Sequence, residues 1–414
     1  MYILFKSFAD RGLGTLHIEV RGDWLIPFNI FGRFTILCAI LRQLHLSVSL
    51  LLEGAFGYDV IFLDQLSASI PLLQFLRPRP AVLFYCHFPD KFLASRDGLV
   101  RKLWRVPFDY VEGVTTNMAD VVVVNSHFTA NIYKEAFKDY TTTYPQVIYP
   151  GVTKKYHNIE DLTSSHTNLN SVIGSRKLVL SLNRFDPKKN IQLVLSSYSK
   201  LSSLKGFENT LLIIAGGYDS RLSENVNCLQ GLQQYCDEHG LAHYTIQAGE
   251  EKEIAHQIPS VQVLFMLSIG SETKQFLLNR ATVLAYTPKN EHFGIVPLEA
   301  MSMGTPVLAT NTGGPLETIE NEQTGWLTPA QDWPGTLERI LFTLGEQELE
   351  EMGDRGRIRV SQYFTTKTMA KDLELAIVAM REHKKPTNRK REFIIAAIIA
   401  IVIALVAILM YSAL

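Results

Sequence analysis

The stretch that decides the fold of this chain is Asn290-Glu291-His292-Phe293-Gly294-Ile295-Val296-Pro297-Leu298-Glu299-Ala300-Met301. It follows the apolar run from Val283 to Tyr286, so it predicts a loop that leaves a buried strand and opens a helix. Gly294 lets the backbone approach a ligand closely, and the N–H groups of Ile295 and Val296 at a helix N-terminus attract phosphate oxygens. The stretch therefore predicts an anion site at the end of a strand.

Two carboxylates, Glu291 and Glu299, flank this helix start. Two glutamates at this spacing are by themselves a weak pattern, because solvated carboxylates on a helix explain most instances. The surroundings strengthen it: the segment 304–310 predicts a helix exit into a strand, and Gly313-Gly314 a second turn beside the first. Two glycine turns at adjacent strand ends mark a ligand crevice, where Glu299 can accept both hydroxyls of a ribose.

Short apolar runs alternate with helical segments along the whole chain. This alternation is typical of βαβ units with parallel sheets, the α/β class. The 414 residues suit two domains, which we predict at 1–150 and 151–382, with a linker from Tyr149 through the polar stretch ending at Ser175. The predicted strands are Val60 to Leu63, Ala81 to Tyr85, Val121 to Val124, Leu178 to Leu182, Leu211 to Ala215, Val283 to Tyr286 and Val307 to Thr310.

Charge and cysteine content exclude several classes of function. The chain has 40 basic and 41 acidic residues, so nothing global indicates a nucleic-acid partner. Its 4 cysteines are scattered without a paired spacing, which argues against a disulfide framework or a zinc site and fits a reducing compartment. We expect no metal site.

The apolar excess lies near the C-terminus. The run from Phe393 to Met410 has no polar residue and is long enough to span a bilayer, so we predict a transmembrane helix at 393–413; the alternative is a buried core helix. The basic segment 383–392 precedes it, and the first residues do not form a secretory signal. The positive-inside rule then places the large N-terminal part in the cytosol. A second apolar region, 28–52, predicts a partly buried helix that contacts either the core or a membrane surface.

Several motifs resemble those of the retaining GT-B glycosyltransferases, which have two Rossmann-like domains facing a central cleft. Within that class they are similar to the GDP-mannose-dependent α-1,3/1,6-mannosyltransferases that extend the dolichol-linked precursor of N-glycans. The resemblance covers the chain from about Gly22 to Phe364. The motifs are Phe84-Tyr85-Cys86-His87-Phe88-Pro89-Asp90, Val124-Asn125-Ser126-His127-Phe128-Thr129, Asn183-Arg184-Phe185, Gly216-Gly217-Tyr218-Asp219 and the segment 286–317.

The resemblance assigns roles to the charged residues. Arg184 and Lys189 match the pair that grips the donor pyrophosphate, and two cations with a helix N-terminus would stabilise the leaving GDP without a metal ion. Glu291 matches the carboxylate at the donor sugar, and Glu299 the ribose ligand. Composition alone favours a solvated loop for Arg184, Lys188 and Lys189, but their place just after the first strand of the second domain favours the binding role.

Other positions keep a structural alternative. His87 matches a histidine facing the transferred sugar, although a lone histidine after an apolar strand is often structural. Gly216 and Gly217 close a strand beside the nucleotide, either as contacts or because the backbone shape requires glycine. Asn125 and Ser126 either point into the cleft or cap the next helix.

The implied function is transfer of mannose from GDP-mannose, with retention, onto mannosyl-chitobiosyl-diphosphodolichol, first by an α-1,3 and then by an α-1,6 linkage. The resemblance implies that the protein acts at the cytosolic face of the endoplasmic reticulum membrane. It allows association with other early N-glycan transferases. It implies no cofactor besides the donor. The family's first domain opens with a strand and a Gly-Gly-Ala-Glu type loop, where this chain has Arg11-Gly12-Leu13-Gly14 without a clear apolar strand before it. We therefore expect an N-terminally incomplete first domain. The alternatives are another transferase with a lipid acceptor and an inactive, membrane-tethered partner protein.

Overall fold

The computed structural model of the chain describes residues 3–8, 15–20, 25–30, 34–52, 58–76, 78–94, 96, 98–153, 163–247, 249–250, 261–382 and 397. It divides into two compact units. Unit 1 comprises Met1–Ile148 and Lys371–Leu414, and unit 2 comprises Tyr149–Ala370. The division after Ile148 lies two residues from the predicted domain boundary, whereas 371–382, which we had placed in the second domain, belongs to unit 1.

Unit 2 is built on a seven-stranded, wholly parallel sheet with the order β13-β12-β11-β7-β8-β10-β9. All four strands predicted in this part of the chain are present, because each is a short apolar run bounded by turn residues. Three further strands, β9, β10 and β13, complete the sheet. The bounds are β7 Lys177–Leu182, β8 Thr210–Gly216, β9 His243–Ile246, β10 Val263–Leu267, β11 Val283–Tyr286, β12 Val307–Thr310 and β13 Gly325–Thr328.

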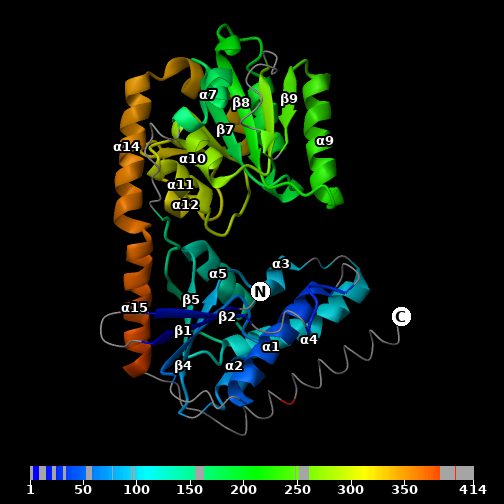
Figure 1. Cartoon of the computed structure of the whole chain (residues 1–414), viewed down its shortest axis with the longest axis vertical. Coiled ribbons are helices and arrows are strands. Elements are labelled where there is room, and N and C mark those ends of the chain that lie inside the picture. The colour runs from blue at the N-terminus through cyan, green and yellow to red at the C-terminus, as the bar shows by residue number, and fades with distance from the viewer. Residues whose placement is uncertain are drawn as a thin grey trace. The chain divides into compact units, whose positions relative to one another are not determined.

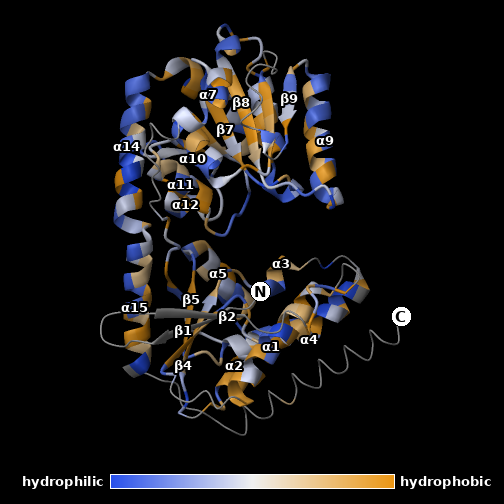
Figure 2. Cartoon of the chain, viewed as in Figure 1, coloured by the Kyte–Doolittle hydropathy of each residue, from blue (hydrophilic) through white to orange (hydrophobic). Residues whose placement is uncertain are grey.

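Helices cover both faces of this sheet, as Figure 1 shows for α9 on one side and α10 and α11 on the other. The strands are apolar along their length, while the outer helices mix apolar and polar residues (Figure 2). The bounds are α7 Thr167–Ile173, α8 Gln192–Ser199, α9 Ser223–Glu238, α10 Ser271–Arg280, α11 Ile295–Ser302, α12 Pro315–Thr318, α13 Trp333–Glu338, α14 Glu346–Tyr363 and α15 Thr366–Glu382, with the single turn η1 at Pro187–Lys189 and the π-helical turn η5 at Arg339–Thr343.

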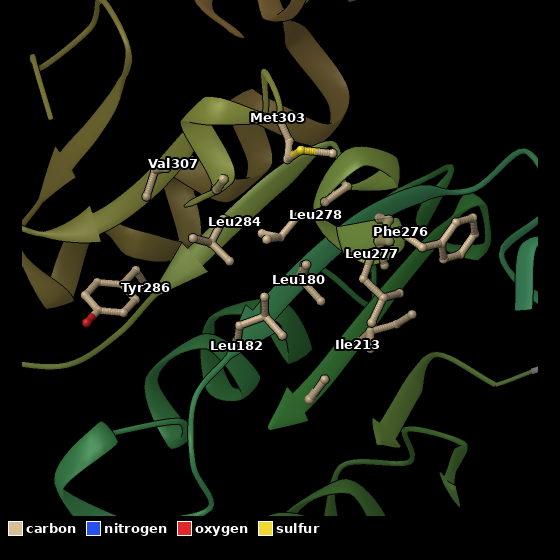
Figure 3. Packing of buried hydrophobic residues seen from close by; sticks show 14 of the residues in the cluster. Leu180, Leu182, Ile213, Phe276, Leu277, Leu278, Leu284, Tyr286, Met303 and Val307 are labelled. Atoms are coloured by element: carbon tan, nitrogen blue, oxygen red, sulfur yellow. The ribbon is translucent and has the colours of Figure 1, made fainter. Parts of the chain in front are cut away.

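Two apolar layers form the core of unit 2, because successive strand residues point to opposite faces. Leu178, Leu180 and Leu182 of β7 pack into one layer, and Val179 packs into the other. In the first layer Leu180 and Leu284 lie against Leu277 and Leu278 of α10 (Figure 3). A sheet buried on both faces requires apolar residues at consecutive positions, which explains the continuous apolar runs in the sequence.

Unit 1 contains a four-stranded parallel sheet in the order β3-β4-β5-β6 and a separate antiparallel hairpin, β1-β2. All three strands predicted here are present. The bounds are β1 Ile3–Phe8, β2 Thr15–Val20, β3 Val60–Asp64, β4 Ala81–Cys86, β5 Val121–Val124, β6 Gln146–Val147, α1 Thr35–Leu52, α2 Ile70–Leu73, α3 Asp90–Leu93, α4 Leu99–Thr116 and α5 His127–Ala136.

Two sequence-based expectations are corrected. A strand, β1, does precede the segment 11–14, because Ile3–Phe8 pairs with Thr15–Val20. The polar stretch that we interpreted as a linker contains α7, whose Leu169 and Ile173 are buried in the core of unit 2. The segment 11–14 itself, the basic segment 383–392 and the predicted membrane helix, apart from residue 397, lie outside the described residues.

The apolar region 28–52 forms α1, which packs in unit 1. Leu37 and Ile40 join Phe108 and Val111 of α4 in one apolar cluster, and the polar residues Arg42 and Gln43 are also buried. Among the described residues, α1 is the one helix long and apolar enough to cross a membrane, a statement about length and composition only. Of the two possibilities left open by the sequence, the structure favours core packing.

Candidate donor site

The candidate site lies where the strand order of the unit 2 sheet reverses. From β7 the chain moves outward through β8 on one side, and it later returns to add β11 on the other side of β7. Loops that follow β7 and β11 therefore leave the same edge of the sheet in opposite directions, which is where open α/β sheets bind ligands. Arg184, Lys189 and Glu291 all lie in these two loops or just beyond them.

The loop after β11 is held in place by close backbone contacts with the glycine turn that follows β12. The N–H of Gly314 donates to the carbonyl of Glu291 at 2.7 Å. A Cβ on Gly314 would lie 2.3 Å from Cα of Phe293, and one on Gly313 would lie 2.6 Å from the carbonyl oxygen of Glu291. Only glycine fits at this distance, so the Gly-Gly pair fixes the loop that carries Glu291.

The helix α11 begins at Ile295, as predicted. Gly294 precedes it with φ 88° and supplies no side-chain cap. The first N–H groups of a helix have no partner within the helix, and together with the helix dipole they favour an anion. Ile295 is exposed and Val296 is half-buried, so this helix end opens at the surface of unit 2.

Lys189 and Glu291 meet between these two loops. The Lys189 Nζ lies 2.6 Å from Oε2 of Glu291, and both side chains are largely buried. Thr287 ties the two loops together, because its hydroxyl donates to the carbonyl of Lys189 at 2.7 Å. Burial, and then the adjacent Glu291 carboxylate, raise the pKa of the Tyr286 hydroxyl well above its ordinary value. The structure thus joins two of the predicted site residues in one ion pair.

Arg184 follows β7 on the same edge and is 71% exposed, with its guanidinium 3.8 Å from Asp186. Its backbone is anchored by neighbours on both sides: Asn183 N donates to the carbonyl of Ala215, and Phe185 N to that of Gly217. The charge of Arg184 therefore projects from a loop whose backbone is hydrogen-bonded on both sides.

Gly216 is explained by backbone shape. Its φ is 150°, and a Cβ there would lie 2.1 Å from the carbonyl oxygen of Asn183. Any side chain would therefore push β8 away from the loop after β7. Gly217 is less restricted, because its Cβ would meet only the Arg184 side chain, at 3.3 Å.

Glu299 has a partner that the sequence analysis missed. Lys274 of α10 lies with its Nζ 2.7 Å from Oε1 of Glu299. Nothing in the local pattern of α10 distinguishes this lysine from other charged helix residues. The pairing depends on how α10 and α11 pack, which the sequence spacing of 25 residues does not reveal.

His87 lies in unit 1, directly after β4. Its Nε2 is 2.6 Å from Oδ1 of Asp64 at the end of β3, and its ring packs on Tyr85 with centroids 4.8 Å apart. Asn125 donates from its side chain to the carbonyl of His87 at 3.0 Å. Asp64, His87 and Asn125 thus share the carboxyl edge of the unit 1 sheet, and Asp64 was not expected there.

Of the two possibilities for Ser126, the structure shows the cap. Its Oγ accepts from the N–H of Thr129 at 3.0 Å, at the start of α5. Asn125 instead holds the loop that carries His87.

Among the residues that the structure describes, no group of three or more His, Cys, Asp or Glu is placed to hold a metal ion. What the unit 2 edge offers is a helix N-terminus, the exposed cation of Arg184, the Lys189–Glu291 pair and the Glu299 carboxylate. This set can bind an anionic group and the hydroxyls of a sugar.

Two solved structures have a similar fold. A sucrose-phosphate synthase from Thermosynechococcus elongatus aligns with a TM-score of 0.64 at 22% identity, covering 86% of this chain and 81% of that one. The Anabaena protein Alr3699/HepE, solved with UDP-glucose, aligns with a TM-score of 0.61 at 19% identity, covering 82% and 84%. The family model described as "Glycosyl transferases group 1" matches residues 168–359. The fold is that of the GT-B glycosyltransferases.

Curated relatives narrow the class. The α-1,3/1,6-mannosyltransferase ALG2 of Rhizomucor pusillus is 40% identical over 383 residues, covering 90% of this chain and 82% of that protein. ALG2 of Saccharomyces cerevisiae is 42% identical over 396 residues, covering 90% and 77%. The chain belongs to this family of α-1,3/1,6-mannosyltransferases, and the resemblance seen in its motifs is confirmed.

Proposed function

We propose that the chain transfers mannose from GDP-mannose, with retention, onto mannosyl-chitobiosyl-diphosphodolichol. It forms the α-1,3 and then the α-1,6 linkage of the N-glycan precursor. Membership in the family supports the type of transfer. The observation that carries the donor site is the Lys189–Glu291 pair beside the open N-terminus of α11, at the point where the strand order reverses.

In this proposal the pyrophosphate of the donor lies against the first N–H groups of α11, with Lys189 and Arg184 beside it. Negative charge grows on the departing GDP, so donors and cations already fixed in place stabilise the transition state more than the ground state. We assign neutralisation of the negative charge on GDP to these groups and not to a metal ion. Transfer that stops in a chelator and returns with Mg²⁺ would contradict that assignment.

Glu291 then accepts hydroxyl groups of the mannose, and its pairing with Lys189 orients its carboxylate. Glu299 accepts the two hydroxyls of the ribose, and Lys274 holds its carboxylate in position at 2.7 Å. Because α10 and α11 both contribute, the ribose site depends on the packing of these two helices. Replacement of Glu299 with alanine should raise the KM for the donor about 10- to 100-fold, the equivalent of losing hydrogen bonds to a charged group. The exposed Glu272 of α10 provides the matched control, Glu272→Ala.

His87 is proposed to face the transferred sugar or the acceptor from unit 1, oriented by Asp64. The membrane location is proposed from the sequence: the apolar run 393–410 anchors the chain, and the basic segment 383–392 stays on the cytosolic side of the endoplasmic reticulum membrane. A lipid-linked acceptor and an anchored enzyme share one surface, which raises their effective concentration. Association with other early transferases remains a prediction.

The test is a transfer assay with the purified full-length protein in detergent. Labelled GDP-mannose is supplied with a phytanyl-diphosphate acceptor that carries one mannose on chitobiose. We expect one and then two added mannoses. Transfer from UDP-N-acetylglucosamine in place of GDP-mannose would contradict the assigned donor, and no transfer from either donor would favour an inactive partner protein.

A further inference from the structure

The helix α4 in unit 1 exposes a row of large apolar side chains. Leu99, Leu103, Val106 and Tyr110 are 77%, 71%, 60% and 48% exposed. Their spacing of four, three and four residues puts them on one side of the helix, the pattern that usually faces a core. Here that side faces solvent, and apolar residues are visible along α4 in Figure 2.

The opposite side of α4 is firmly packed, so the helix cannot roll to hide this row. Phe108 and Val111 are buried against α1. Arg105 is also buried, with its guanidinium 2.7 Å from Asp90 and 2.8 Å from Asp109. The Asp90 carboxylate of α3 and the apolar cluster with α1 thus fix which side of α4 faces outward.

The short helix α3 packs on the other side of α4, away from this row. The backbone N–H groups of Asp90 and Lys91 donate to the Glu112 carboxylate of α4 at 2.7 and 2.9 Å, which clamps α3 to α4. We call Leu99, Leu103, Val106 and Tyr110 the α4 apolar surface.

An exposed cation borders this surface. Lys102 lies four residues before Val106, so the two side chains are neighbours on α4, and Lys102 is exposed. A row of apolar side chains beside basic ones is the composition of helices that lie in the headgroup region of a bilayer, where cations meet lipid phosphates.

The connectivity of the chain indicates that the partner of this surface is a lipid bilayer. The end of α15 belongs to unit 1, where Arg381 lies 3.9 Å from Asp59. The ten residues 383–392 then separate α15 from the apolar run that begins at Phe393. Ten extended residues reach at most about 35 Å, so an anchored chain keeps unit 1 close to the bilayer surface.

We propose that the α4 apolar surface is a second membrane contact, which lies in the headgroup region and fixes the orientation of unit 1 on the bilayer. This inference rests on the proposed membrane anchor. It predicts that the surface matters for acceptors embedded in a bilayer and is dispensable for acceptors free in solution, because only the former require unit 1 to sit in one orientation.

The direct test places a probe on the surface. The full-length protein, with Cys228 changed to serine, is reconstituted in phosphatidylcholine and phosphatidylinositol vesicles. A nitrobenzoxadiazole fluorophore is attached at Leu103→Cys or, as the control, at Ile358→Cys on the exposed side of α14 in unit 2. We expect a blue-shifted emission and severalfold stronger quenching by nitroxide-labelled lipids at position 103. Equal, weak quenching at both positions overturns the proposal. That result is expected if the surface binds another protein.

The second test measures function. Leu103→Glu/Val106→Glu is compared with Leu375→Glu/Val378→Glu, a pair of exposed apolar residues three apart on α15 in the same unit. With a long-chain acceptor in vesicles, we expect the α4 pair to lose activity about tenfold, which corresponds to about 1.4 kcal/mol, and the α15 pair to keep it. Both pairs should keep activity on a short-chain acceptor in solution. Equal activities with the vesicle acceptor contradict the inference, whereas failure of the unmodified chain with both acceptors contradicts the proposed function.

Discussion

Both units place a basic side chain against a carboxylate at the carboxyl edge of a parallel sheet, and the two pairs differ in their surroundings. Lys189–Glu291 in unit 2 and His87–Asp64 in unit 1 have the same 2.6 Å separation. The unit 2 side chains are 23% and 21% exposed, whereas those in unit 1 are 48% and 52% exposed. Charges held away from water interact more strongly and are screened less by salt. Equal distances therefore do not mean equal energies.

The backbones that carry the two pairs also differ. In unit 2 the loop of Glu291 is held by a glycine turn at distances that admit no Cβ. In unit 1 the loop of His87 is held by a side chain, that of Asn125. A fixed loop suits a site that must present charges to a donor without rearrangement, because pre-positioned groups need no reorganisation during the reaction.

The comparison is tested most strongly by Lys189→Ala. This change removes a cation from the donor site and leaves Glu291 without its partner, so we expect kcat/KM to fall about 100- to 1,000-fold. Lys188→Ala, at the exposed neighbouring position, is the control and should keep near-normal activity. Steady-state kinetics with GDP-mannose provide the measurement. Similar rates for the two variants would show that the buried pair has no special role.

Gly314→Ala tests whether the glycine turn fixes the loop. The new Cβ would lie 2.3 Å from Cα of Phe293, so the loop must move, and we expect a loss of stability of about 1–3 kcal/mol together with loss of transfer. The control is Gly335→Ala in α13, where no heavy atom lies within 4 Å of the new Cβ. Melting temperature and activity are measured together. A Gly314→Ala protein with normal activity would contradict the role assigned to this turn.

Glu112 predicts a pH effect that originates in unit 1. Burial, and then the nearby Asp90 carboxylate, raise the pKa of Glu112 to about 7. An acid with a raised pKa binds its proton more tightly in the folded state, so stability falls as the pH rises from the unfolded value near 4.5 to about 7, and the penalty is complete above that.

Relative to Glu112→Gln, the wild type should therefore lose up to about 3 kcal/mol between pH 4.5 and pH 8. Thermal unfolding in detergent across this range measures the difference. Parallel pH profiles for the two proteins would contradict a raised pKa at this position.

The smallest effect is expected for Asp64→Asn. Because the pair with His87 is about half exposed, its contribution to stability should be below about 1 kcal/mol. The melting temperature should hardly change, and any loss of transfer should be modest compared with that of Lys189→Ala. A large drop in melting temperature would mean that the unit 1 pair is as important for folding as the glycine turn of unit 2.

Much of the fold and part of the candidate site follow from the sequence. All seven predicted strands are present, and α11 begins where the Gly294 pattern places it. The apolar run Val263–Leu267 became a strand that we had not predicted, because a short apolar run is equally compatible with a buried helix. The prediction of a linker in the polar stretch that contains α7 was wrong. Only two residues of α7, Leu169 and Ile173, are buried, so the stretch shows little apolar pattern.

The sequence by itself determined the class of fold, the glycine turns and the helix start of the donor site, because these depend on local backbone preferences and on the period of the apolar residues. Tertiary structure decided that Lys189 meets Glu291, that Lys274 meets Glu299, that Asp64 meets His87, and that the end of α15 belongs to unit 1. Each of these contacts joins residues distant in the chain. They depend on how strands are ordered and how helices pack, which no local pattern contains.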